Sequence, residues 1–126
     1  MPRFSETLLD HARSPRNAGI LKDANAVGNA SLHNKAPRVT IYLKIDDNIV
    51  ARASFQAFGS GVTIACCSIL NEMLIGRSVD DCHRIEAKGL IDGLDGVPTD
   101  KRFCAELALN ALQSPIDDDS FKALDR

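Results

Sequence analysis

The chain has 126 residues, a formal net charge of -2, 44% apolar residues and 25% charged residues. These values are typical of a folded globular domain and exclude a disordered or fibrous chain, so we expect a single domain over residues 1–126 with a short tail from about residue 115. The slightly negative net charge gives no basic surface to attract phosphates, and a single tyrosine with no tryptophan gives few aromatic rings for bases to stack on. We therefore do not expect nucleic acid as a partner.

The sequence indicates neither a membrane-spanning segment nor a disulfide framework. The longest apolar runs fall short of the roughly 18 residues of a membrane span, and the first residues lack the apolar stretch of a signal peptide. We therefore expect a cytoplasmic protein with no membrane partner. Four irregularly spaced cysteines do not form a disulfide framework, and a reducing compartment keeps them as thiols. These cysteines are Cys66, Cys67, Cys82 and Cys104.

The first elements in chain order are a helix and a strand. Residues 4–13 place apolar side chains on one helical face with Ser5 as the N-cap, and Pro15 ends this helix. Residues 16–19 contain Asn and Gly, which favour a turn. A first strand is predicted over residues 24–32.

A hairpin follows this strand. Apolar and polar side chains alternate over residues 39–45 and again over residues 49–57, which is the period of a strand with one buried face. Residues 46–48 supply turn chemistry between the two segments. The pattern therefore predicts two antiparallel strands.

Helices occupy the second half of the chain. The apolar period lengthens to that of a helix over residues 62–75, and shorter helices are predicted after Ser78 and near residues 85–94. A last helix is predicted over residues 99–112 and is closed by Pro115.

The order of elements indicates the fold class. We expect an α+β domain in which helices pack on one face of a small antiparallel sheet of about three strands. Beyond the last helix, the acidic run at 117–119 is interpreted as a solvated loop or the N-terminal cap of a tail helix over residues 120–124.

Several segments, taken in order, resemble the NifU-like (IscU-like) iron-sulfur cluster scaffold family. The similarity covers roughly residues 4 to 114 and implies a SufE/NifU-like fold. The segments are Phe4-Ser5-Glu6, Asp10-His11, Pro15-Arg16-Asn17-Ala18-Gly19, Ala24-Asn25-Ala26-Val27-Gly28, Phe55-Gln56-Ala57-Phe58-Gly59-Ser60-Gly61, Ile64-Ala65, Leu70-Asn71-Glu72-Met73 and Leu94-Asp95-Gly96-Val97-Pro98-Thr99-Asp100-Lys101.

The resemblance implies a site for a [2Fe-2S] cluster made of three cysteines, an aspartate and a histidine. In this chain the family ligand positions fall on Lys35, Pro37, Ser60, Phe103 and Cys104. Because a binuclear cluster ordinarily takes four protein ligands and only Cys104 keeps a thiol, ordinary cluster assembly is expected to fail. The chain thus resembles a divergent member that keeps the fold and has lost most of its ligands.

Three other residues are candidates for a rebuilt site that holds iron, zinc or a cluster. Cys66 and Cys67 follow Ser60 by one to two helical turns, although core packing is the commoner role of such residues. His33 precedes Lys35 by two residues and is a candidate ligand, although a loop histidine is more often solvated. A protein without any cofactor is a further alternative.

Cys104 is the main candidate functional residue, with core packing as an equally weighted alternative. Its position in the first turn of the last helix is expected to stabilise a thiolate, and Lys35 and Arg102 are expected to lower its pKa further. The resemblance implies that the matching cysteine of the family accepts a persulfide from a cysteine desulfurase.

Three functions remain open at this point. The first is a scaffold-type iron-sulfur assembly protein with an incomplete or rebuilt ligand set, and the second is a persulfide acceptor that uses Cys104 without a cluster. The third is an interaction module that regulates a desulfurase or a true scaffold. No enzymatic motif is present, so we expect no enzyme. A cysteine desulfurase is the expected partner, and a chaperone or a second copy of the chain are further candidates.

Overall fold

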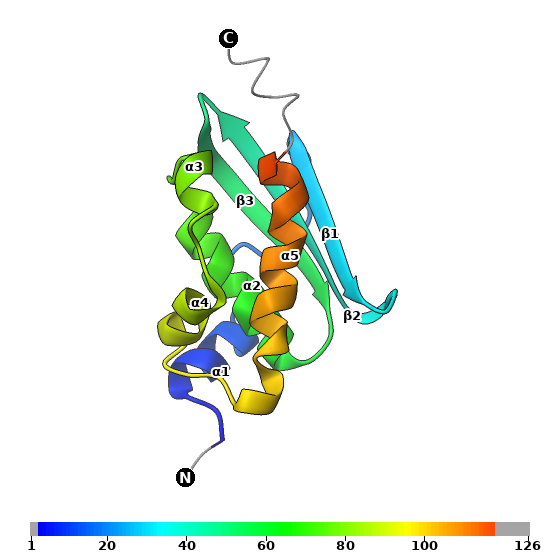
Figure 1. The fold of residues 1–126 in the computed structure, drawn as a ribbon, viewed down its shortest axis with the longest axis vertical. Coiled ribbons are helices and arrows are strands. Elements are labelled where there is room, and N and C mark those ends of the chain that lie inside the picture. The colour runs from blue at the N-terminus through cyan, green and yellow to red at the C-terminus, as the bar shows by residue number, and fades with distance from the viewer. Residues whose placement is uncertain (1–2, 118–126) are drawn as a thin grey trace.

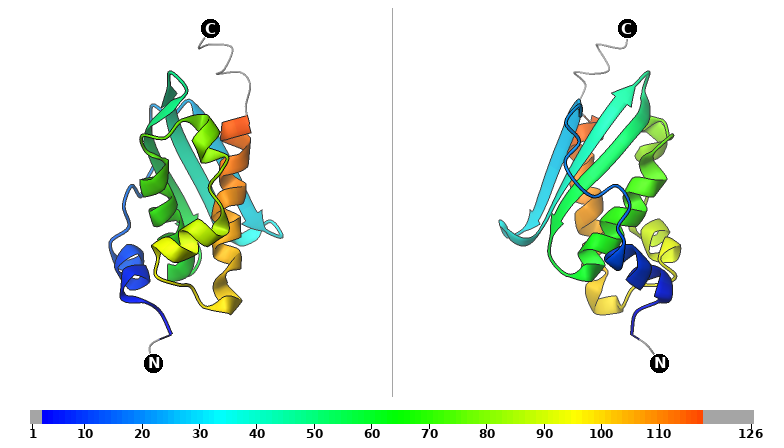
Figure 2. Two further views of the ribbon diagram at one scale, coloured as in Figure 1. Left: turned by 60° about the vertical axis from the view of Figure 1, so that its left-hand side comes forward. Right: turned by 180° about the vertical axis from the view of Figure 1, so that it is seen from behind.

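The computed structural model describes residues 3–117, in which one helix precedes three strands and the remaining helices follow (Figure 1). The strands form one antiparallel sheet in the order β1-β2-β3, and α2 and α5 cover one face of it (Figures 1 and 2). This arrangement confirms the predicted fold class. The elements are α1 (Glu6–Arg13), β1 (Ala26–Leu32), β2 (Lys35–Asp46), β3 (Ile49–Phe58), α2 (Gly61–Leu74), α3 (Val79–Cys82), α4 (Ala87–Gly93), η1 (Thr99–Lys101) and α5 (Phe103–Asp117).

The β2–β3 hairpin follows from the alternation of side chains. Ile41 and Leu43 are buried on the helix-covered face and pair with Phe55 and Ala53 on the neighbouring strand. The intervening turn uses positive φ at both central residues, 47 and 48, which matches the twist of the strands. The predicted hairpin is therefore confirmed.

Strand β2 begins earlier than the alternation indicated. It starts at Lys35 because residues 35 and 38 pair through their backbones with Leu32 and Ser31 of β1. Backbone pairing of this kind leaves no alternating pattern of side chains, so the sequence showed the strand only from residue 39 onward.

Close packing of α5 on β1 depends on Gly28. A Cβ atom at this position would lie 2.0 Å from the carbonyl oxygen of Ala111 and 2.4 Å from Cδ of Pro115. Pro115 has no N–H to donate to the Ala111 carbonyl, yet the helix continues to Asp117. The expectation that Pro115 ends the helix was wrong, because the proline lies in the last turn and packs against the sheet.

The start of the last helix also differs from the prediction. Residues Thr99–Lys101 form a separate 3-10 turn, and the α-helix begins at Phe103 rather than at residue 99. Apolar periodicity does not distinguish a short 3-10 turn from the first turn of an α-helix, because both place residues three apart on one side.

The segment after α1 joins the free edge of β3. The N–H of Gly19 donates to the carbonyl of Phe55 at 2.7 Å, and the N–H of Phe55 donates to the carbonyl of Asn17 at 3.1 Å. Both Asn17 and Gly19 have positive φ, as the predicted turn requires. This pairing protects part of the β3 edge and fixes the opening segment on the sheet.

Two expectations concern the ends and the environment of the chain. The tail helix over residues 120–124 lies outside the described residues. Within residues 3–117, no helix is long and apolar enough to cross a membrane.

Candidate functional site

Three of the positions that the resemblance assigns to cluster ligands meet at one end of the sheet. A Cβ atom at Gly59 would lie 2.8 Å from Cβ of Pro37 and 3.0 Å from Oγ1 of Thr63, so the turn before α2 lies on the beginning of β2. Thr63 Oγ1 in turn lies 3.4 Å from Sγ of Cys104. The fold thus brings Pro37, the turn containing Ser60 and the start of α5 together.

The side chains at these positions do not fit an iron-sulfur cluster. Lys35 is exposed and presents an ammonium group, which repels iron cations, and Pro37 has no side-chain donor. Ser60 is exposed at the N-cap of α2, and Phe103 is 41% exposed with an aromatic ring in place of a donor. A hydroxyl is a poor ligand for a soft iron-sulfur centre, so the set lacks the four thiolate or imidazole ligands that a cluster takes.

The remaining thiol is enclosed. Cys104 lies in the first turn of α5, as predicted, but its side chain is fully buried and contacts the hydroxyl of Thr63. Thr63 is itself 1% exposed. A thiol with no exposed surface cannot reach a sulfur donor or a metal ion in solution unless α2 and α5 separate locally.

Cys66 and Cys67 are fully buried on α2. They lie three and four residues after Thr63, on the helical side that faces Cys104. Burial, with a smaller contribution from charge repulsion by Cys104, raises the pKa of Cys66 to about 12, and burial also raises the pKa of Cys67. Core packing is therefore the role that the geometry favours for both.

The structure does not assemble the rebuilt metal site from its candidate residues. His33 is exposed in the turn between β1 and β2 with φ of 53°, whereas the three thiols are buried. Across residues 3–117, no three side chains of His, Cys, Asp or Glu form a group that could hold a metal ion. Metal binding by these residues stays a prediction.

Comparison with known proteins decides the family. The sequence profile of the NifU-like N terminal domain matches residues 3–124. This chain belongs to the NifU-like N-terminal domain family. The chain is 34% identical over 115 residues to the iron-sulfur cluster assembly scaffold protein IscU 1 of Archaeoglobus fulgidus, covering 91% of this chain and 75% of that protein. It is 33% identical over 120 residues to IscU of Haemophilus influenzae, covering 91% and 94% of the two chains.

Solved structures of other proteins share the fold of this chain. An iron-sulfur cluster assembly scaffold protein for the SUF system from Fervidobacterium islandicum superposes with a TM-score of 0.71 at 16% identity, covering 90% of this chain and 96% of that one. The N-terminal part of a NifU-like protein from Brucella abortus gives 0.60 at 19% identity, covering 96% and 81%. At these identities the likeness supports the fold.

The buried thiols of this NifU-like domain are expected to resist alkylation. Burial is the main cause that raises the pKa of Cys66 to about 12 and that of Cys82 to about 11, so both thiols stay protonated at pH 8. Iodoacetamide at pH 8 should therefore label the four cysteines at least about a hundredfold more slowly in the folded protein than in urea. Mass spectrometry of digested peptides measures each site, and rapid labelling of Cys104 in the folded protein would show that the thiol is accessible.

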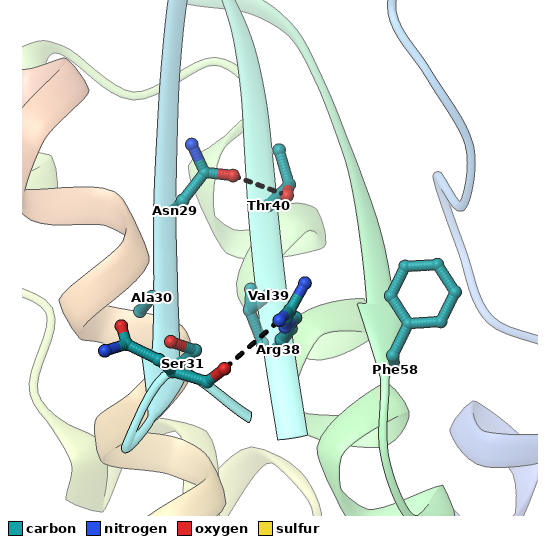
Figure 3. Close-up of a pocket in the computed structure, with 8 residues that line it drawn as sticks. Asn29, Ala30, Ser31, Arg38, Val39, Thr40 and Phe58 are labelled. Carbon is teal, nitrogen blue, oxygen red and sulfur yellow. Dashed lines mark hydrogen bonds between the residues drawn. The ribbon is translucent and has the colours of Figure 1, made fainter. Parts of the chain in front are cut away.

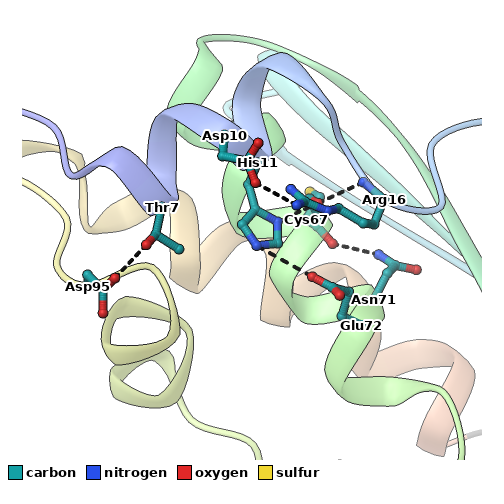
Figure 4. Close-up of polar contacts among 9 residues, drawn as sticks. Thr7, Asp10, His11, Arg16, Cys67, Asn71, Glu72 and Asp95 are labelled. Carbon is teal, nitrogen blue, oxygen red and sulfur yellow. Dashed lines mark hydrogen bonds and ion pairs between the residues drawn. The ribbon is translucent and has the colours of Figure 1, made fainter.

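A polar cluster that the sequence did not reveal lies between α1 and α2 (Figure 4). Nδ1 of His11 lies 2.7 Å from Oγ of Ser68, and its Nε2 lies 3.4 Å from a carboxylate oxygen of Glu72. The N–H of Arg16 donates to the same Ser68 hydroxyl at 2.9 Å, and its guanidinium pairs with Asp10. The buried His11 therefore links α1 to two side chains of α2.

The His11 cluster predicts that the domain loses stability in mild acid. Burial, with a smaller contribution from Arg16, lowers the pKa of His11 below its usual 6.5, against the opposite effects of Glu72 and Asp10. The unfolded chain then binds the proton more readily, so stability is full above pH 6.5 and falls as the pH decreases from 6.5 toward the lowered pKa. Urea unfolding between pH 7.5 and 5 measures this loss. The free energy of unfolding should depend less steeply on pH in the variant His11→Gln than in the unaltered protein. Equal dependence on pH in the two proteins would contradict the role given to His11.

Proposed function

We propose that this protein takes part in iron-sulfur cluster assembly as a scaffold-type protein with an incomplete ligand set, which does not hold a [2Fe-2S] cluster through the family positions. Membership of the family and the names of the IscU relatives support the assembly role. One observation supports the incomplete set. Three of the five family positions meet at one end of the sheet, yet the five carry an ammonium, a proline ring, a hydroxyl, a phenyl ring and a buried thiol.

The persulfide-acceptor alternative requires Cys104 to become exposed. A cysteine desulfurase transfers sulfur to a thiolate that it contacts, and Cys104 has no exposed surface in the described conformation. This alternative stays a prediction, tested by a mass increase of one sulfur atom after incubation with a desulfurase and cysteine. The geometry favours the first proposal, in which the buried thiol is part of the core.

We propose further that the protein acts in the cytoplasm, without an enzymatic reaction of its own, together with a cysteine desulfurase. The free state of all four cysteines is consistent with a reducing compartment. The partner is proposed from the family, because a degenerate member that keeps the fold can keep the docking surfaces of that fold. A pull-down with a purified desulfurase measures this interaction, and a failure to bind at micromolar concentrations would contradict it.

The test of the main proposal is the composition of the protein purified without oxygen. Iron, zinc and acid-labile sulfide are measured for the unaltered protein and for Cys104→Ser. We expect all three to be far below one atom per chain in both proteins, because the ligands are missing. Iron and sulfide near the ratio of a binuclear centre, lost in Cys104→Ser, would overturn the proposal.

A further inference from the structure

The end of the sheet that lacks cluster ligands carries an unusual distribution of charge. Three segments meet there, residues 31–38, 58–63 and 101–105. They contain no aspartate or glutamate, although the whole chain has a net charge of -2. Their cations are Lys35, Arg38, Lys101 and Arg102.

Within residues 3–117, these four cations form no ion pair with a carboxylate, whereas six other cations do. The six are Arg3, Arg16, Lys44, Arg52, Arg84 and Lys88. Arg38 donates to the backbone carbonyl of Asn34 at 3.1 Å, and Lys35 is exposed. Lys101 already acts on the neighbouring carboxyl of Asp100, whose pKa is lowered mainly by Arg3 and also by Lys101. The charges that stay free to act on a partner are therefore those of Lys35 and Arg38.

Apolar rings lie among these cations. Phe58 is 63% exposed and pairs across the sheet with Arg38, and Phe103 is 41% exposed beside Arg102. Arg38 and Phe58 line a hollow of about 540 Å³ on the sheet, together with polar side chains that include Asn29 and Thr40 (Figure 3). An exposed phenyl ring beside an unpaired guanidinium is a combination that binds an apolar and an acidic side chain together.

We infer that the surface around this hollow, made of Lys35, Arg38 and Phe58, docks an acidic protein segment that carries an apolar side chain. The carboxylates lie against the unpaired cations, and the apolar side chain lies against Phe58. Charge complementarity favours an acidic partner, because a partner with its own cations would face the positive charges of Lys35 and Arg38. Docking of this segment does not depend on whether the protein holds iron. The binding experiment and the metal analysis can therefore fail independently of each other.

The binding experiment uses the full chain and a fluorescein-labelled peptide of alternating aspartate and glutamate with one central phenylalanine. Anisotropy at about 0.05 M salt should show saturable binding that weakens on the order of tenfold at about 0.5 M salt. Lys35→Glu combined with Arg38→Glu should weaken binding at least about tenfold, and Phe58→Ser about threefold. Circular dichroism confirms that these exposed substitutions leave the fold intact.

The matched control changes the net charge equally at other places. Lys22→Glu combined with Arg84→Glu alters two exposed cations outside this surface and should change the affinity by less than about twofold. An equal loss in the control, or no binding by the unaltered protein at low salt, would overturn the inference. Tighter binding of a single-stranded oligonucleotide or of anionic vesicles than of the peptide would also overturn it, because the surface would then serve a different class of partner.

Discussion

Replacing Gly28 by alanine is expected to lower the free energy of unfolding by about 3 kcal/mol. The added Cβ would lie 2.0 Å from the Ala111 carbonyl oxygen, and a backbone atom in the middle of α5 cannot rotate away as a side chain can. The helix must therefore shift away from β1, which loosens the packing that buries Ala111 and Pro115. Urea unfolding followed by circular dichroism measures the change.

The control for this substitution is Gly89→Ala in α4. A Cβ at Gly89 would meet only Cε of Met73 at 3.7 Å, which is an ordinary contact, and alanine favours a helix over glycine. We expect a gain of about 0.5 kcal/mol in this variant. If Gly28→Ala proves no more destabilising than Gly89→Ala, α5 does not pack on β1 as closely as described.

Restoring the family ligands is expected to create iron binding where the unaltered protein has none. The combined variant is Lys35→Cys, Pro37→Asp, Ser60→Cys and Phe103→His. Together with Cys104, once α2 and α5 separate locally to admit the metal, the variant offers three thiolates, an imidazole and a carboxylate at the family positions, which is a donor set suited to iron and sulfide. We expect iron and sulfide to rise to about two of each per chain after anaerobic reconstitution.

The restored variant requires its own control, since added cysteines can bind metal without forming a site. Adding Cys104→Ser to the same variant removes one ligand and should lower the iron content severalfold while leaving the other introduced donors in place. Failure of the restored variant to bind iron, although folded, would mean that the backbone at this end of the sheet differs from that of a cluster site.

The sequence predicted the sheet well because its signal is local. The alternation through Ile41 and Leu43 and the turn at residues 46–48 fixed the hairpin, and the structure confirms both. The ends of α5 could not be predicted in the same way. Whether Pro115 ends a helix depends on what lies beside the carbonyl of residue 111, and here that neighbour is Gly28, far away in the sequence.

The site was predictable in its positions but not in its chemistry. The family resemblance located Ser60 and Cys104, and the fold brings their segments together. Core packing of Cys104 was one of two equally weighted expectations, but its contact with Thr63 joins two helices, and no pattern within either helix revealed that partner. The partners of His11 on α2 were missed for the same reason, because they lie 57 or more residues away in the chain.

Chemical reconstitution of the unaltered protein is the most direct test of the account. The protein is incubated without oxygen with ferrous iron, sulfide and a thiol reductant, desalted, and examined by visible absorption and by iron and sulfide analysis. The account predicts no absorption from sulfide-to-iron charge transfer and little bound iron, because only one enclosed thiol remains at the family positions. A stable chromophore with about two irons and two sulfides per chain would contradict it.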